Sequence, residues 1–174
     1  MRKKRLLQLT AALLCAVILS ACGGAPADAD YTCTVSISCA TILDNMDQCA
    51  EGKKELVPAD GVILPPTEVA FAEGESAFDV LQRVCRDNGI HLESKFTPVY
   101  NSAYIQGIHN IYEFDVGKLS GWMYAVNDWF PNYGCSLYQV QDGDVIRWVY
   151  TCDLGADVGG GQAAGDGQQE GAST

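Results

Sequence analysis

Residues 74–89 read GESAFDVLQRVCRDNG, and this stretch decides the fold because it predicts the one long amphipathic helix of the chain. Ser76 and Asp79 form a capping box, in which the serine caps a free N–H and the carboxylate faces the positive helix end. The Asn88-Gly89 pair ends the helix. Apolar side chains recur every three or four residues and form a single core-facing stripe, which consists of Ala77, Val80, Leu81, Val84 and Cys85.

Strands are predicted on both sides of this helix. Residues 31–39 alternate apolar and polar side chains, as a half-buried strand does. Residues 41–54 are polar, with at most one helical turn, and residues 57–71 end in a short extended segment after two prolines. The later strands are expected at 91–96, 111–114, 121–127 and 145–150. This order predicts an α+β domain, in which the main helix covers one face of a small mixed or antiparallel sheet.

The N-terminus predicts a lipoprotein signal peptide over residues 1–21. Four basic residues precede an apolar core at 6–19, which is too short to span a bilayer comfortably. The sequence LSAC at 19–22 resembles the bacterial lipoprotein box, in which the cysteine, here Cys22, is lipidated and becomes the new N-terminus. An uncleaved anchor and a soluble secreted protein are the alternatives. We therefore expect an exported protein, lipid-anchored at the bacterial cell membrane and facing outside the cytoplasm.

The remaining chain divides into three parts. Residues 22–30 form a lipidated tether, residues 31–154 the folded domain, and residues 155–174 a Gly/Ala/Gln-rich tail that we expect to be disordered. The chain carries 22 acidic and 11 basic side chains. Cleavage would remove four of the basic ones, so the formal net charge would change from −11 to −15. This excludes nucleic acid as a partner and leaves the lipid anchor as the route of membrane attachment.

Six cysteines are left once Cys15 departs with the signal and Cys22 takes the lipid. An even number in an exported chain favours disulfides, and Cys39 with Cys49 is the pairing to test first. Zinc is the alternative, but no C-x-x-C pair is present and the two histidines lie far from any paired cysteines. We expect no metal and no other cofactor. The disulfide candidates are Cys33, Cys39, Cys49, Cys85, Cys135 and Cys152.

Residues that could carry catalysis or bind calcium have simpler explanations. The sequence lacks G-x-S-x-G, G-x-G-x-x-G, H-E-x-x-H and Walker motifs. His91 and His109 have no nucleophile or acid near them in sequence, and a structural or surface role is expected. Asp142 and Asp144 flank a glycine, but a calcium loop supplies far more oxygen ligands, so a tight turn is expected. We therefore expect a protein that is not an enzyme.

Half of the 16 aromatic residues lie between positions 121 and 150. Trp122 and Tyr124 share one face of a predicted strand, which favours packing in the core. The connection 127–134, NDWFPNYG, is different because Trp129, Phe130 and Tyr133 lie among turn-forming residues. There they would form an exposed apolar platform for a planar ligand or a partner surface. The alternative is that the loop folds back and buries Trp129.

Three ordered motifs resemble the transcobalamin C-terminal-like domain family. They are GESAFDVL at 74–81, SGWMYAVN at 120–127 and DGDVIRWVY at 142–150, and the resemblance covers about residues 67–151. It implies a β-grasp-like fold, a non-enzymatic role and a corrinoid, or cobalamin-like, ligand. In the vertebrate carriers the corrinoid lies between a large α-helical barrel domain and this small domain. Because 153 residues contain no such barrel, we expect this chain to supply one wall of the site.

Two functions follow from this reading. The first is a surface lipoprotein that captures a corrinoid or another flat apolar ligand through Trp129, Phe130 and Tyr133, with Trp122 and Tyr124 behind them. The second is a protein-interaction or adhesion module on the cell surface, in which the same rings form a docking patch.

Overall fold

The structure is a computed structural model that describes residue 26 and residues 29–160. The predicted signal peptide, Cys22, most of the tether and residues 161–174 of the predicted tail lie outside these residues. Within the described ranges, no helix has the length and apolar character needed to cross a membrane.

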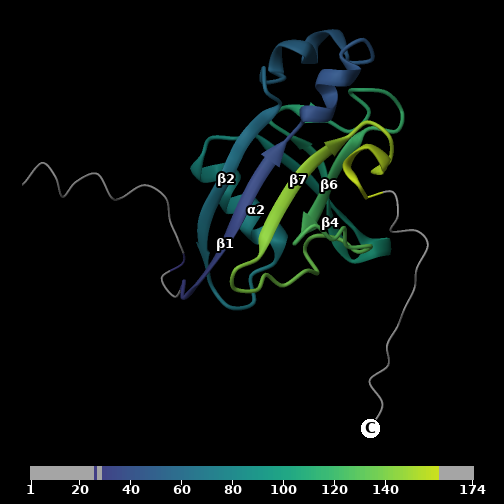
Figure 1. The fold of residues 1–174 in the computed structure, drawn as a ribbon. Coiled ribbons are helices and arrows are strands. Elements are labelled where there is room, and N and C mark those ends of the chain that lie inside the picture. The colour runs from purple at the N-terminus through teal and green to yellow at the C-terminus, as the bar shows by residue number, and fades with distance from the viewer. Residues whose placement is uncertain (1–25, 27–28, 161–174) are drawn as a thin grey trace, which may run out of the picture.

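The main sheet has four strands in the order β2-β1-β7-β6. They are β1 (Tyr31–Ser38), β2 (Val62–Phe71), β6 (Gly121–Val126) and β7 (Val145–Thr151). The two central strands, β1 and β7, are parallel, and both flanking pairs are antiparallel. The first and last strands of the domain therefore lie side by side at its centre (Figure 1).

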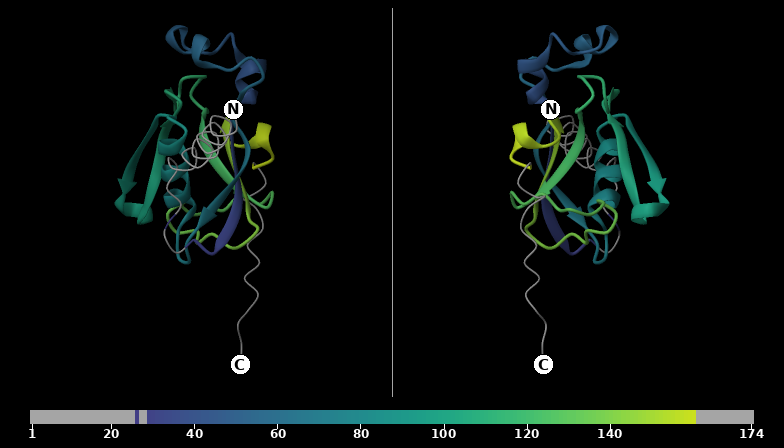
Figure 2. Two further views of the ribbon diagram at one scale, coloured as in Figure 1. Left: turned by 90° about the vertical axis from the view of Figure 1, so that its left-hand side faces the viewer. Right: turned by 90° about the vertical axis from the view of Figure 1, so that its right-hand side faces the viewer.

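A smaller antiparallel sheet has the order β3-β4-β5. Its strands are β3 (Leu92–Thr97), β4 (Ser102–Ile108) and β5 (Ile111–Tyr112), and the short 3₁₀ helix η3 (Pro98–Tyr100) joins the first two. Figure 2 shows the β3–β4 hairpin beyond the α-helix, on the same side of the main sheet. The sequence predicted β3 but not β4.

The α-helix α2 (Ala77–Asp87) has the predicted capping box. The Asp79 N–H donates to Ser76 Oγ at 3.2 Å, and the Ser76 N–H donates to Asp79 Oδ2 at 2.9 Å. All five predicted stripe residues are buried. They pack against the inner face of the main sheet, where Val35, Ile37 and Trp148 contribute to the same core. The α+β class with one main helix is confirmed within the described residues.

Arg83 also lies on the buried side of α2, although it is charged. Only 8% of its surface is exposed, and its guanidinium forms an ion pair with Glu75. It also donates to the Ala70 carbonyl at 2.9 Å, while Glu75 accepts from the Ala72 N–H at 2.8 Å. The bond from Arg83 to Ala70 joins α2 to the edge strand β2, and Glu75 ties Arg83 to the residue that follows this strand.

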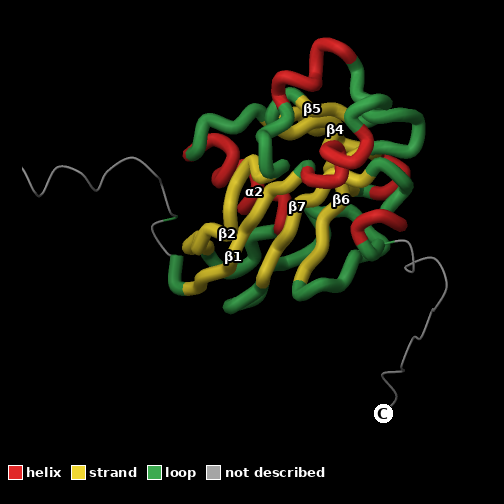
Figure 3. Tube along the Cα trace, turned by 45° about the horizontal axis from the view of Figure 1, so that its top comes forward, coloured by secondary structure: helices red, strands yellow, loops and turns green. Residues whose placement is uncertain are grey.

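The segment before β2 differs from the predicted polar stretch. It contains two 3₁₀ helices, η1 (Ala40–Asn45) and η2 (Glu51–Leu56), which stand at one end of the main sheet (Figure 1). Figure 3 shows the helical segments in red beside the yellow strands of the sheet. β2 itself is longer than expected and includes Pro65 and Pro66. An edge strand tolerates proline because its outer side has no ladder partner that needs the missing N–H.

The folded region continues past the predicted boundary at residue 154. A short 3₁₀ helix, η4 (Ala156–Val158), lies between Gly155 and Gly159, both of which have positive φ. Asp157 holds this turn by accepting from the Cys152 N–H at 2.7 Å. The expectation of disorder from residue 155 onward is thus wrong for residues 155–160, because side-chain capping fixes a segment whose composition suggests a tail.

Candidate functional site

The loop after β6 begins with a tight two-residue turn. Asn127 and Asp128 both have positive φ, at 50° and 66°, and the backbones of Val126 and Trp129 exchange two hydrogen bonds of 2.8 and 2.9 Å. This is the arrangement of a type I′ hairpin turn, which favours asparagine and aspartate. The turn reverses the chain and sets which rings of the loop face solvent.

The structure separates the three predicted loop rings. Trp129 is 52% exposed and Tyr133 40%, and their rings meet edge to face with centroids 6.0 Å apart. Phe130 is only 6% exposed because it turns inward, with Gly160 close against its ring. The expectation that Phe130 belongs to the exposed platform is therefore wrong, whereas Trp129 is not buried by its own loop.

Trp122 and Tyr124 belong to the core. Each packs across the β6–β7 pair. Trp122 lies edge to face on Tyr150 with ring centroids 5.3 Å apart, and Tyr124 stacks on Trp148 with ring centroids 5.5 Å apart. The core-packing interpretation of both residues is confirmed. Tyr124 also lies behind the loop, since its hydroxyl donates to the Tyr133 carbonyl at 3.0 Å. It supports the position of Tyr133 from below and does not present its own ring to solvent.

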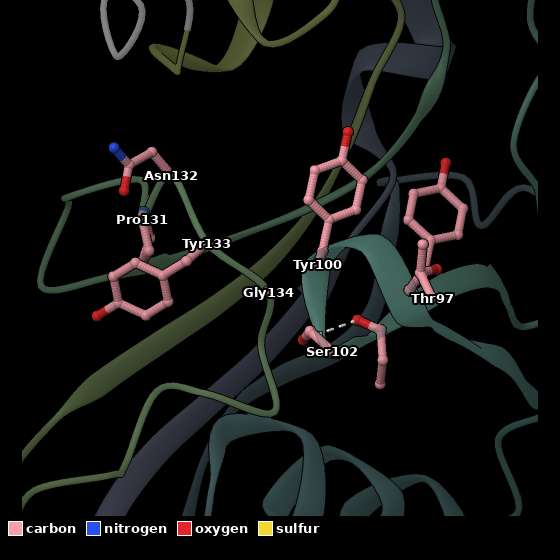
Figure 4. A pocket seen from close by; sticks show the side chains of 9 residues that line it. Thr97, Tyr100, Ser102, Pro131, Asn132, Tyr133 and Gly134 are labelled. Carbon is pink, nitrogen blue, oxygen red and sulfur yellow. Dashed lines mark hydrogen bonds between the residues drawn. The ribbon is translucent and has the colours of Figure 1, made fainter.

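A cleft of about 260 Å³ opens between residues 131–134 of the loop and the η3–β4 segment. Figure 4 shows Tyr133 on one side and Tyr100 on the other. Tyr100 is 72% exposed, and Tyr104 from β4 completes that wall. The sequence singled out neither Tyr100 nor Tyr104, because they approach the predicted loop only in the folded chain.

The floor of the cleft is a close contact between two segments. Ser102 and Ser136 join their hydroxyls at 2.8 Å, and the Ser136 oxygen also accepts from the Ala103 N–H at 3.0 Å. Gly134 passes so near that a Cβ built on it would lie 1.9 Å from Ser102 Oγ. The loop is thereby held against β4, and the two tyrosine-bearing walls are fixed relative to each other.

The polar groups of the cleft are uncharged. Its lining contains tyrosine, threonine, serine and asparagine but no acidic or basic side chain. Glu113 lies just outside, where it accepts from the Tyr104 hydroxyl at 2.5 Å. Burial, together with this carboxylate, raises the pKa of Tyr104 to about 12, so the phenol stays protonated at neutral pH. The Thr97 hydroxyl is buried and has no hydrogen-bond partner among the described residues.

The six predicted disulfide candidates are all thiols in the structure, and five of them are buried. Burial raises the pKa of Cys33, Cys39, Cys85 and Cys135 to about 12. Three thiols gather near the ends of β1 and β7: Cys49 and Cys152 both raise the pKa of Cys39, and Cys49 also raises that of Cys152. No set of three or more histidine, cysteine or acidic side chains in the described part of the chain is arranged to hold a metal ion.

The other polar candidates have structural roles. Asp144 is buried and accepts from the Asn127 amide at 2.8 Å and the Tyr138 hydroxyl at 2.9 Å, while Asp142 accepts from the Thr32 N–H at 3.0 Å. The turn interpretation of this acidic pair is confirmed. His91 is exposed beside the ring of Tyr112.

Comparisons with known proteins place these features in context. Residues 74–152 match the model of a family described as a domain of unknown function (DUF4430). No curated protein matches the chain. Among solved structures, haptocorrin in complex with Cbi is similar at 14% identity and a TM-score of 0.50, over 71% of this chain. The matched chain is much longer, since this chain covers 26% of it.

A second solved structure is a protein from Ruminococcus gnavus ATCC 29149 described as a candidate metal-binding protein. It has 15% identity and a TM-score of 0.42, and the match covers 70% of this chain and 97% of the other. At 14% identity, the similarity to haptocorrin supports a shared fold and nothing further.

Proposed function

We propose that this protein is a non-enzymatic ligand-binding lipoprotein, exported and attached to the bacterial cell membrane through Cys22. The observation that carries the binding role is the cleft, because exposed Tyr100 and Tyr133 both line it and its other walls are uncharged. Exposed rings held by a rigid frame are the usual form of a site for a flat ligand. The topology of the main sheet and α2 supports a β-grasp-like classification as part of this proposal.

A corrinoid is the first ligand to test. Haptocorrin, which shares the fold, was solved in complex with Cbi, a cobalamin analogue. The cleft of about 260 Å³ is smaller than the roughly 300–1,000 Å³ that encloses a drug-sized ligand. A corrinoid would therefore rest on Trp129 and Tyr133 with only an edge group in the cleft, and a partner chain would provide the opposite wall.

Titration of the purified chain with cobalamin, followed by tryptophan fluorescence, tests this proposal. Saturable quenching is expected, because Trp129 is exposed beside the cleft and contacts Tyr133. A Trp129→Phe, Tyr133→Ala variant should lose most of the affinity, whereas Tyr31→Ala, at an exposed ring on β1, should keep it. Absence of saturable quenching at high micromolar cobalamin would remove the corrinoid from consideration.

A protein-interaction or adhesion module is the second candidate. It is favoured by the tip of the β3–β4 hairpin, where Phe96, Val99 and Tyr100 are all exposed. Apolar side chains grouped on a projecting tip are typical of a docking patch. A Val99→Ser substitution should abolish capture of a surface protein while leaving ligand binding in the cleft unchanged, since Val99 does not line it.

We propose a disulfide between Cys39 and Cys49, as the even cysteine count suggests for an exported chain. Its support is the cluster that both thiols form with Cys152 at the end of the main sheet. Thiol counting on unreduced, exported protein, unfolded before labelling, should find few or no free thiols among the six. Four or more free thiols would refute the disulfide prediction.

The anchor is tested separately. Labelling of cells with a palmitate analogue should mark the wild-type protein but not a Cys22→Ser variant. The variant should also be released from membranes by washing, because the acidic domain has no affinity of its own for anionic headgroups.

A further inference from the structure

The cleft is an uncharged site on an acidic protein. The chain has a formal net charge of −11, yet no charged side chain lines the cleft among the described residues. The Tyr104 wall is flanked by two opposite charges outside the lining, the Lys95 ammonium 5.4 Å from the ring centroid and the Glu113 carboxylate on the hydroxyl, so neither an anionic nor a cationic ligand would find an uncompensated partner in the cleft. Both would also leave their charge partly desolvated and unpaired. The lining therefore selects a neutral ligand.

The polar groups of the lining are suited to hydroxyl groups. Asn132 offers an amide that can both donate and accept, whereas the Ser102 hydroxyl is buried and already bonded to Ser136. Tyr104 donates its proton to Glu113, so its oxygen is left as an acceptor. Thr97 lies in the same wall, and its hydroxyl has no partner within residues 29–160, so a rotation about χ1 would turn it toward a bound ligand.

The two exposed rings supply the apolar part of the site. Tyr100 and Tyr133 lie on opposite sides of the cleft (Figure 4). The face of an aromatic ring is negative, and it attracts C–H groups that carry a small positive charge. A sugar ring has such C–H groups on its faces and hydroxyls around its rim. It would pack its face on a tyrosine and direct its hydroxyls toward the walls.

The size of the cleft agrees with this class of ligand. Its volume of about 260 Å³ lies just under the range of roughly 300–1,000 Å³ found for drug-sized molecules. It can hold a single hexose ring and the beginning of the next, but not a corrin macrocycle. The close contact of Gly134 with Ser102 keeps the walls at this separation.

We propose that this cleft binds a neutral hexose ring of an oligosaccharide, with Tyr100 and Tyr133 as stacking platforms and Thr97 and Asn132 as hydroxyl partners. The inference rests on the proposed ligand-binding function of the cleft, but it does not require a corrinoid. The absence of charge in the lining, the size of the cleft and its side chains all favour the same class of ligand.

The test uses the purified full chain with three neutral probes and one anionic probe. Maltohexaose, cellohexaose and N-acetylchitohexaose are compared with a galacturonic acid hexamer by saturation-transfer NMR and calorimetry. At least one neutral probe should bind with a Kd of about 1 mM, as expected for one ring in a small open site. The anionic hexamer should not bind.

Variants locate the site. Tyr100→Ala and Tyr133→Ala should each weaken binding about three- to tenfold, the effect of losing one aromatic contact. Tyr133→Phe, which keeps the ring, should retain affinity within about threefold. Tyr31→Ala is the matched control, because this exposed ring lies on β1 and outside the cleft. All four variants should unfold at temperatures close to that of the wild type.

Each outcome decides the question. Failure of all three neutral probes at about 10 mM overturns the inference, as does equal binding of the anionic hexamer. Binding that Tyr100→Ala and Tyr133→Ala leave unchanged also overturns it. If cobalamin binds and Tyr133→Ala weakens it while no oligosaccharide binds, the sugar is wrong and the ligand-binding function stands. If neither class binds, both are wrong.

Discussion

Gly134 and Ser102 fix the width of the cleft at the scale of single residues. The backbone of the loop lies against Ser102 at a distance that leaves no room for a side chain at position 134. Ser136 then bonds both the Ser102 hydroxyl and the Ala103 N–H. The position of Tyr133 relative to Tyr104 thus depends on one residue having no Cβ.

A Gly134→Ala substitution is expected to destabilise the fold and to open the cleft. The new Cβ would lie 1.9 Å from Ser102 Oγ and 2.2 Å from Ser102 Cβ, so the loop must move away from β4. Forced overpacking of this kind costs about 1–3 kcal/mol. Urea denaturation monitored by circular dichroism measures the change, and ligand titration should show a parallel loss of affinity.

Gly52→Ala is the matched control for that experiment. Gly52 has no atom within 4 Å of a built Cβ and does not have a positive φ. The substitution should leave stability within about 0.5 kcal/mol or raise it slightly, through the smaller entropy of the unfolded chain. Equal destabilisation by the two substitutions would show that the Ser102 contact does not hold the loop.

At the scale of elements, the ion pair between Arg83 and Glu75 attaches α2 to the edge of the sheet. Glu75→Gln removes the charge that compensates a guanidinium with only 8% of its residue surface exposed. Leaving one buried charge unpaired costs about 3–5 kcal/mol. We expect a loss near the lower end, because Glu75 is partly exposed and Ala70 still accepts from Arg83. Chemical denaturation measures it.

Arg86→Met provides the comparison. Arg86 forms its ion pair with Asp87 at 3.1 Å on the exposed side of the same helix. Exposed pairs contribute about 0–1 kcal/mol, so this variant should unfold at nearly the wild-type urea concentration. The argument for the buried pair fails if Glu75→Gln is as mild as Arg86→Met.

The elements that the sequence predicted correctly are those with local signals. Ser76 and Asp79 define the start of α2 within four residues, and alternation defines β1 in the same way. β4 and the cleft lacked such a signal. Residues 97–104 and 131–134 become neighbours only in the folded chain, where Ser136 bonds Ser102 and Ala103, and no spacing in the sequence reveals these contacts. The turn at Asn127 and Asp128 likewise decides that Trp129 faces solvent and Phe130 does not.

At the scale of the whole molecule, stability should depend on pH in alkaline solution. Burial raises the pKa of four thiols from 9.0 to about 12, so the folded state favours their neutral form. The unfolded chain loses these protons first. The stabilising contribution is therefore complete below about pH 9 and is lost as the pH rises toward 12. The groups are Cys33, Cys39, Cys85 and Cys135.

Urea unfolding of the reduced protein at a series of pH values checks this dependence. The free energy of unfolding should decline steadily between pH 9 and 12. In oxidised protein the decline should be shallower, because a cysteine in a disulfide no longer titrates. A flat profile for the reduced protein over that range would contradict the burial of these thiols.

The parallel pairing of β1 with β7 gives the domain a mechanical property. β1 begins at Tyr31 and β7 ends at Thr151, and the two strands run in the same direction with Thr34 opposite Val145 and Ser38 opposite Val149. A pull applied to the start of β1 and the end of β7 slides the strands past each other. It therefore loads all the hydrogen bonds between them together and does not peel them apart in sequence. If the domain is tethered at its N-terminal end and pulled at its C-terminal end, the force acts along the direction in which the sheet resists unfolding most strongly.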